Sequence, residues 1–152
     1  MVAPILLFAV GNESRGDDAL GPLLLRRMAV VAMRGVECQE DYQWQVEHAA
    51  DLAGRSHVLF IDADVACAPP FRFDEIIAAH DQSYTSHAMS PQALLHAYEQ
   101  VYGGSAPRSF VLRIRGYDFT LGMPPAPAAL DNLRQAESFL HDWLCRAGAS
   151  HA

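Results

Sequence analysis

The chain has 152 residues, of which 51% are hydrophobic and 19% are charged, so it is long and apolar enough to bury a core. Its 18 acidic and 11 basic residues give a net charge of −7, and every basic residue is an arginine. The arginines are scattered, which argues against nucleic-acid binding as the main role, because that role needs clustered cations. The opening apolar run, residues 2–10, contains a proline and is too short to cross a membrane.

Three cysteines, Cys38, Cys67 and Cys145, lie far apart in the sequence. Their spacing forms neither a CxxC metal knuckle nor a redox pair, and their odd number leaves at least one free thiol. This use of cysteine is typical of a reducing compartment, so we expect a cytoplasmic protein.

The apolar pattern of the first half predicts alternating strands and helices. A continuous apolar run closed by Gly11 indicates a buried strand that ends in a tight turn, and Gly35 stops the helix that follows. The predicted elements are a buried strand at residues 5–10, a helix at 19–33, a weaker strand at 36–44, a short helix at 46–52 and a buried strand at 58–61. Asp62 then follows directly after a buried strand.

The second half adds an edge strand, two helices and one more buried strand. Apolar residues that alternate with Arg72 and Asp74 indicate a strand with one wetter face, antiparallel and near a sheet edge. Ser90 and Pro91 suit the N-cap and the first position of a helix. The predicted elements are the edge strand at 71–77, a polar loop at 78–89, a helix to about residue 102, a strand at 110–114, a Gly- and Pro-rich stretch at 116–127 and a helix at 128–146.

Strands that alternate with helices predict an α/β fold, a three-layer sandwich in which helices cover both faces of a mostly parallel, twisted five-stranded sheet. With no repeat and no linker in the sequence, we expect a single domain over residues 1–152. Trp44 and Trp143 are expected to pack over the sheet, and the acidic residues between 37 and 51 to form solvated surface. Ligands of such a sheet bind at the carboxyl ends of its strands.

The first loop at that end carries two adjacent carboxylates, Asp17 and Asp18, at the predicted start of a helix. The helix dipole favours anions there, and a helix-capping role for one of the two is the simplest explanation. A nucleotide phosphate would meet both carboxylates, and the glycines at 11, 16 and 21 do not form a GxGxxG motif.

Asp62 is the second candidate, because a carboxylate after four apolar strand residues is costly to bury unless it is paired or bound to a metal. It could equally accept backbone N–H bonds from the next loop. We expect Asp64 to point to the opposite side and rank it lower.

The third candidate loop contains His80 and His87. A lone loop histidine is usually only solvated. Together with one aspartate from each of the other loops, His87 would form a ligand set of two carboxylate oxygens and one imidazole nitrogen. Such a set suits a borderline divalent metal ion with open coordination positions.

Taken in order, these motifs resemble the hydrogenase maturation endopeptidases, which trim the large subunit of [NiFe] hydrogenases. The resemblance covers nearly the whole chain. It rests on the strand closed by Gly11-Asn12 with the acidic pair after it, on Asp62-Ala63, and on a histidine ahead of Leu94-Leu95. The segment at residues 14–22 is most similar to members that serve bidirectional, NAD-linked hydrogenases.

We expect Asp18 or Asp62 to serve as the catalytic base. The resemblance implies that Asp18, Asp62 and His87 bind the metal. It also implies that the substrate brings the nickel, held by cysteines of the large-subunit precursor, so that the isolated protein can be metal-free. The protease then removes the C-terminal tail of the precursor. The first ligand is glutamate in some relatives and the shorter aspartate here.

Two other functions stay open at this point. A non-catalytic module could hold a metal or a partner tail at the same loops without cleaving it. A hydrolase of another type could use Ser14 or Cys67, but the sequence has no GxSxG motif, and Cys67 is better explained as a small apolar filler. A peptidase would also need a groove for the tail, which we expect near residues 116–125.

Overall fold

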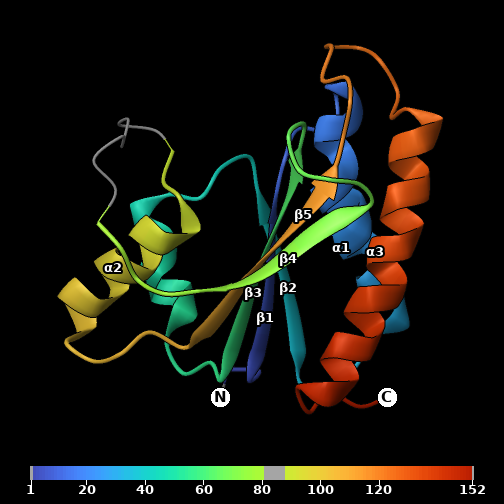
Figure 1. Cartoon of the computed structure of the whole chain (residues 1–152). Coiled ribbons are helices and arrows are strands. Elements are labelled where there is room, and N and C mark those ends of the chain that lie inside the picture. Colours follow the sequence, from blue (N-terminus) through green and yellow to red (C-terminus); the bar gives the residue numbers. More distant parts are fainter. Residues whose placement is uncertain (1, 81–87, 152) are drawn as a thin grey trace.

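Four parallel strands and one antiparallel strand form the central sheet, and the computed structural model describes residues 2–80 and 88–151 (Figure 1). The strands are β1 (Ile5–Val10), β2 (Val36–Asp41), β3 (His57–Asp64), β4 (Phe71–Ile76) and β5 (Arg108–Arg115), in the order β2-β1-β3-β5-β4. β4 runs antiparallel to β5 at the edge. The predicted α/β fold and the antiparallel edge strand are both confirmed.

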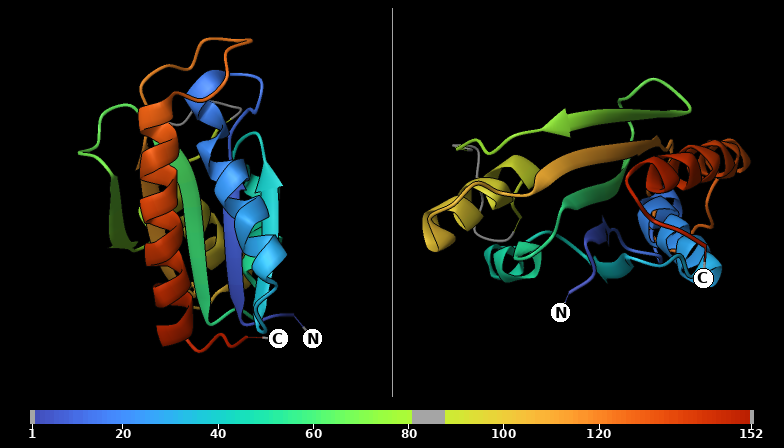
Figure 2. Two further views of the ribbon diagram at one scale, coloured as in Figure 1. Left: turned by 90° about the vertical axis from the view of Figure 1, so that its right-hand side faces the viewer. Right: turned by 90° about the horizontal axis from the view of Figure 1, so that it is seen from below.

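Helices cover both faces of the sheet, as predicted (Figures 1 and 2). One face carries α1 (Leu20–Val31) and α3 (Pro127–Arg146), and the other carries α2 (Pro91–Tyr102) and the 3-10 helix η2 (Val46–Leu52). A further 3-10 turn, η1 (Gly16–Ala19), leads into α1. No helix of the described residues is long and apolar enough to span a membrane.

Alternation along the buried strands divides the core into two layers. In β1, Ile5, Leu7 and Ala9 pack beneath α1 and α3, whereas Leu6, Phe8 and Val10 pack beneath α2 and η2. All six are buried, which explains the continuous apolar run. Trp143 belongs to the first layer and Trp44 to the second, so both predicted core positions are confirmed.

Several predicted boundaries shift by a few residues. α1 ends at Val31 because Ala32 takes a left-handed conformation with φ 53°, before the glycine expected to stop it. β2 ends at Asp41, whose carboxylate accepts a 2.6 Å bond from the backbone N–H of Tyr42. β3 pairs with β5 as far as Asp64, so Asp62 lies inside the strand instead of after it.

The start of α2 matches its sequence signals. The hydroxyl of Ser90 accepts a 3.1 Å bond from the backbone N–H of Ala93, and Pro91 takes the first helical position. The helix ends at Tyr102, and Gly103 after it has a positive φ of 76°.

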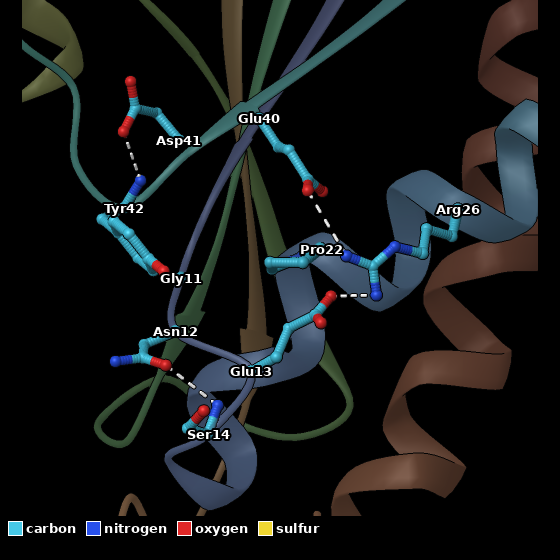
Figure 3. A pocket seen from close by; sticks show the side chains of 9 residues that line it. All are labelled: Gly11, Asn12, Glu13, Ser14, Pro22, Arg26, Glu40, Asp41 and Tyr42. Carbon is cyan, nitrogen blue, oxygen red and sulfur yellow. Dashed lines mark hydrogen bonds and ion pairs between the residues drawn. The ribbon is translucent and has the colours of Figure 1, made fainter.

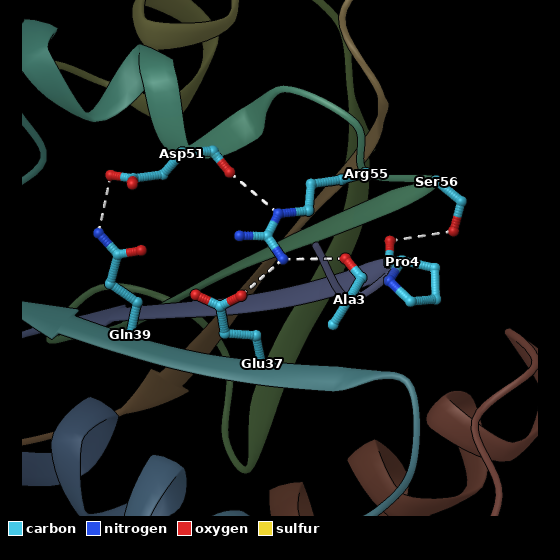
Figure 4. A network of polar contacts seen from close by, with 7 residues as sticks. All are labelled: Ala3, Pro4, Glu37, Gln39, Asp51, Arg55 and Ser56. Atoms are coloured by element: carbon cyan, nitrogen blue, oxygen red, sulfur yellow. Dashed lines mark hydrogen bonds and ion pairs between the residues drawn. The ribbon is translucent and has the colours of Figure 1, made fainter. Parts of the chain in front are cut away.

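The acidic residues between 37 and 51 lie mostly at the surface, as expected, since all are exposed except the half-buried Asp51. Two of them also bind a buried arginine. Arg55 is buried, and its guanidinium donates to the carboxylate of Glu37 (2.9 Å) and to the carbonyls of Ala3 (2.9 Å) and Asp51 (3.0 Å). The Asp51 carboxylate in turn accepts a 2.9 Å bond from Gln39 (Figure 4). This network fixes η2 against the edge strand β2 and the N-terminal segment.

Candidate functional site

The carboxyl ends of β1 and β3 lie side by side, because the two strands are adjacent and parallel. The start of α1 sits directly against both ends. A Cβ atom on Gly21 would lie 2.7 Å from the carbonyl oxygen of Val10 and 3.2 Å from that of Ile61. Glycine therefore permits this approach, and the loop before α1 is held over the end of β3.

Asp17 is a structural residue, and it caps neither η1 nor α1. It is fully buried. Its Oδ2 accepts backbone N–H bonds from Tyr117 (2.6 Å) and Asp118 (3.0 Å), and its Oδ1 accepts one from Ala126 (2.7 Å). These three bonds hold the loop between β5 and α3 against η1, so the expected helix-capping role is wrong for Asp17.

Asp18 is only partly buried. Its Oδ2 accepts a 3.0 Å bond from the backbone N–H of Asn12, which closes the loop after β1, and it does not cap α1 either. Gly11 makes this closure possible, because a Cβ there would collide with the carbonyl oxygen of Asp18. With one backbone bond to Oδ2, the carboxylate of Asp18 keeps acceptor capacity for a ligand.

Asp62 carries the strongly perturbed carboxyl of the site. The pKa of Asp62 is raised from its ordinary value of 3.8 to about 7, mainly by burial and also by the negative charges of Asp18 and Asp64. A 2.8 Å bond from the backbone N–H of Ala63 offsets part of this increase, and the charge of Arg113 offsets the least. Asp62 is therefore a half-buried acid beside two others, with little positive charge to balance it.

One pocket of about 210 Å³ brings Asp18 and Asp62 together. The rest of the lining comes from the end of β1, the segment after β2 and the segment before α2: Val10, Gly11, Tyr42, Gln43, Trp44, Ala88 and Met89. Tyr42 is a lining residue that the sequence interpretation missed. The rule for parallel sheets could have found it, because β2 is the neighbour of β1 and ends at the same edge.

The expectation that Asp64 points to the opposite side is wrong. β3 continues to Asp64, and residues two apart in a strand share a face. Asp64 makes a turn, because its Oδ1 accepts a 2.8 Å bond from the backbone N–H of Ala66 and its carbonyl accepts one from Gly116 (2.9 Å).

The histidine of the predicted metal set, His87, lies outside the described residues. Ala88, the residue that follows it in the sequence, lines the pocket of Asp18 and Asp62. The other histidine of that loop, His80, is exposed, and its ring lies 5.5 Å from that of His96 on α2. The metal role of His87 stays a prediction.

The two alternative nucleophiles are poorly placed. Cys67 is buried, its thiol faces the carbonyl oxygen of Arg113 at 3.8 Å, and burial raises its pKa, which disfavours the reactive thiolate. Ser14 lines a neighbouring hollow of about 530 Å³, and no histidine is among the described residues that line it. Cys67 is buried, as expected, but it belongs to neither of the two apolar core layers, so its role as an apolar filler stays a prediction.

That neighbouring hollow is polar and shares Gly11 and Tyr42 with the pocket of the two aspartates (Figure 3). Arg26 of α1 extends into it and forms ion pairs with Glu13 and Glu40, the latter at 3.3 Å. The three side chains are about half exposed, so these pairs contribute little stability.

The loop that Asp17 anchors projects beyond the sheet at the same end (Figure 1). It presents large apolar side chains to solvent: Tyr117 is 45% exposed, Leu121 71% and Met123 49%. The backbone N–H of Gly122 donates a 2.7 Å bond to the carbonyl of Ser14, which joins this loop to the loop after β1. The predicted groove for a tail in this region stays a prediction.

Comparisons with solved structures identify the fold. Hydrogenase maturating endopeptidase HybD from Escherichia coli matches with a TM-score of 0.76 and 19% identity, over 99% of this chain and 96% of that one. The [NiFe] hydrogenase maturation protease HycI from Thermococcus kodakarensis matches with a TM-score of 0.72 and 15% identity, over 92% and 91%. This chain has the fold of the hydrogenase maturation proteases.

A third structure, the endopeptidase HycI from Escherichia coli, has a TM-score of 0.68 at 20% identity and covers 94% of this chain and 91% of its own. Comparisons with protein-family models and with curated proteins give no match. The likeness to the maturation proteases is thus one of fold, and it extends over nearly the whole length of each chain.

The two adjacent aspartates are predicted to respond differently to the same substitution. Asp17→Asn loses a carboxylate that satisfies three buried backbone N–H groups, so the free energy of unfolding should fall by about 3 kcal/mol. Asp18→Asn keeps an amide oxygen that can accept the bond from Asn12, and its loss should stay below about 1 kcal/mol. Urea unfolding of both variants measures this, and equal losses would contradict the structural role of Asp17.

The raised pKa of Asp62 predicts a pH-dependent stability in metal-free buffer. Between about pH 4 and pH 7 the folded chain keeps a proton that the unfolded chain has released, so the free energy of unfolding falls as pH rises. Asp62→Asn lacks this group and should become more stable than the wild-type chain across that window, by a few kcal/mol at most. Urea unfolding at several pH values measures the difference, and a difference that does not vary with pH would exclude the predicted titration.

Proposed function

We propose that this protein is an endopeptidase that removes the C-terminal extension of a nickel-loaded [NiFe]-hydrogenase large-subunit precursor. One observation carries the proposal: Asp18 and Asp62 line a single pocket at the carboxyl end of the sheet, in the fold of the hydrogenase maturation proteases. Ligands of parallel sheets bind at this end. The assignment to members that serve NAD-linked hydrogenases stays a prediction.

In this proposal Asp18, Asp62 and His87 recognise nickel that the precursor carries. Two carboxylates and one neutral imidazole leave coordination positions free for thiolates of the substrate or for water. The surroundings of Asp62 support this role, because its half-buried carboxyl lies beside two other acids and is stabilised little by the charge of Arg113. A docked cation would favour the ionised form of Asp62 and release its proton.

Hydrolysis of the peptide bond needs a group that accepts a proton from water near neutral pH. We assign this task to the carboxylate of Asp18 or Asp62, because both line the pocket beside which the peptide bond would lie. Water would then attack the scissile carbonyl while that carboxylate accepts its proton, and the same carboxyl group would donate the proton to the departing amine as the C–N bond breaks.

The tail of the precursor must lie beside the pocket to be cut there. The exposed side chains of Leu121 and Met123, on the loop anchored by Asp17, offer apolar contact area at this end. We propose that this loop binds the tail or the adjoining surface of the precursor.

We also propose that the protein acts in the cytoplasm, where the precursor would meet it. All three cysteines are free thiols, and they differ in exposure: Cys38 is half-buried, Cys67 is buried and Cys145 is exposed. Free thiols of this kind are typical of a reducing compartment.

The central prediction is nickel-dependent cleavage. The purified protein should shorten nickel-loaded precursor and leave nickel-free precursor intact, as measured by mass spectrometry of the product. Asp62→Asn, Asp18→Asn and His87→Ala should each slow cleavage by at least about 100-fold, a typical loss for an acid–base group. Glu47→Gln removes an exposed acid on η2 and should cleave at the wild-type rate.

Each other outcome contradicts the proposal. A stable complex with no change in precursor mass would assign the protein to the non-catalytic binding modules. Cleavage that serine or thiol reagents abolish would indicate a nucleophilic hydrolase, and equal processing by Asp62→Asn would remove this residue from the mechanism.

Contact with the loop predicts a selective effect on KM. Replacing both Leu121 and Met123 with serine should raise the KM for precursor by about tenfold, because apolar contact area is lost, with kcat little changed. Val30→Ser removes an apolar side chain that is 86% exposed on α1 and serves as the control. Steady-state kinetics on nickel-loaded precursor separates the two constants, and an unchanged KM in the double variant would exclude the contact.

A further inference from the structure

A second group of metal-ligating side chains lies far from the candidate active site. It contains His141 and Cys145 near the end of α3, and His151 from the segment after α3. Their ligand atoms all lie within 4.8 Å of one another. Figure 1 shows the C-terminus beside the end of α3, at the opposite end of the sheet from the carboxyl ends of β1 and β3. We call these three residues the tail cluster.

Helical spacing places the first two ligands on one face. His141 and Cys145 are four residues apart, which puts their side chains one turn above the other. His141 is partly buried and Cys145 is exposed. Helical pairs at this spacing can bind one ion together, so the helix alone supplies two of the three ligands.

Backbone bonds bring the third ligand back to the helix. After α3 the chain reverses at Gly148, which has a φ of 105°, and the backbone N–H of Ala149 donates a 3.0 Å bond to the carbonyl of Leu144. Ser150 then forms an antiparallel bridge with Arg34, with bonds of 2.7 and 3.4 Å. His151 is thus positioned by the main chain, and its ring centroid lies 5.1 Å from that of His141.

No packing role accounts for the tail cluster. Cys145 and His151 are both exposed, so neither fills space in the core. The carboxylate nearest to His141, from Asp142, lies 3.9 Å away and is itself mostly exposed, which is a weak ion pair. The two imidazoles and the thiol could therefore bind an ion, and packing does not explain why they lie together.

We propose that the tail cluster is a binding site for a zinc-class divalent ion, with two imidazole nitrogens and one thiolate as ligands and water in the fourth position. Nitrogen and sulfur donors in tetrahedral geometry select zinc over magnesium or calcium. Ligand atoms around tetrahedral zinc lie about 3.5 Å apart, so these exposed side chains need to approach by only about 1 Å. Binding converts the Cys145 thiol to a thiolate and releases its proton.

The ion would link the tail to the body of the protein. His151 would be joined to α3 through the metal, in addition to the backbone bridge between Ser150 and Arg34. Because the three ligands come together only in the folded chain, the ion stabilises the folded state. This inference does not depend on the proposed peptidase function, because the tail cluster shares no residue with the pocket of Asp18 and Asp62.

Cobalt(II) in place of zinc tests the thiolate directly. Titration of the full-length Asp62→Asn chain with Co²⁺ should produce a thiolate-to-cobalt charge-transfer band, which Zn²⁺ then removes. Cys145→Ser should abolish the band. His151→Ala should weaken binding by more than about tenfold, because loss of a residue that only supports a metal ligand already costs about that much. Ser150→Ala, in the same tail, and Cys38→Ser, at another thiol, should retain full binding.

Thermal unfolding gives an independent measure. Zn²⁺ should raise the Tm of the wild-type and Ser150→Ala chains but not that of Cys145→Ser, while the metal-free Tm of all three stays the same because the substituted side chains are exposed. The absence of a charge-transfer band, a band that persists in Cys145→Ser, or zinc stabilisation that disappears with Asp62→Asn would each overturn the proposal. The precursor-cleavage assay uses the other pocket, so failure of one proposal leaves the other standing.

Discussion

The close approach of α1 to the ends of β1 and β3 is the constraint on which the site depends. Gly21 permits it, because any side chain there would press on the carbonyl oxygens of Val10 and Ile61. The approach holds the loop before α1 over the end of β3. As a result Asp18, from that loop, and Asp62, from β3, line one pocket although 44 positions separate them in the sequence.

The adjacent residues Asp17 and Asp18 have different roles at this end of the sheet. The carboxylate of Asp17 is consumed by three backbone bonds that fasten the loop between β5 and α3, so its charge is satisfied inside the fold. Asp18 accepts one bond at Oδ2 and lies near Asp62, whose half-buried carboxyl is left with little positive charge nearby. A cation delivered by a substrate would relieve this excess of negative charge, and this is the physical basis of the proposed nickel recognition.

Local signals in the sequence predicted the elements and the place of Asp62 near the carboxyl end of a buried strand, because an unbroken apolar run indicates such a strand. They could not predict the role of Asp17, whose partners Tyr117 and Ala126 lie about a hundred positions away and bond through main-chain groups that any residue carries. The strand β2 was predicted to run too far, because Trp44 continues the apolar pattern but packs into the core beyond a turn. The role of His87 stays a prediction.

Nickel X-ray absorption of the protein bound to a cleavage-resistant, nickel-loaded precursor tests the central claim most directly. If Asp18 and Asp62 bind the nickel, oxygen ligands should appear beside the sulfur ligands when the wild-type protein is added, and fewer should appear with Asp62→Asn. The Glu47→Gln chain should reproduce the wild-type spectrum. A nickel environment that does not change when the precursor is bound would contradict the account.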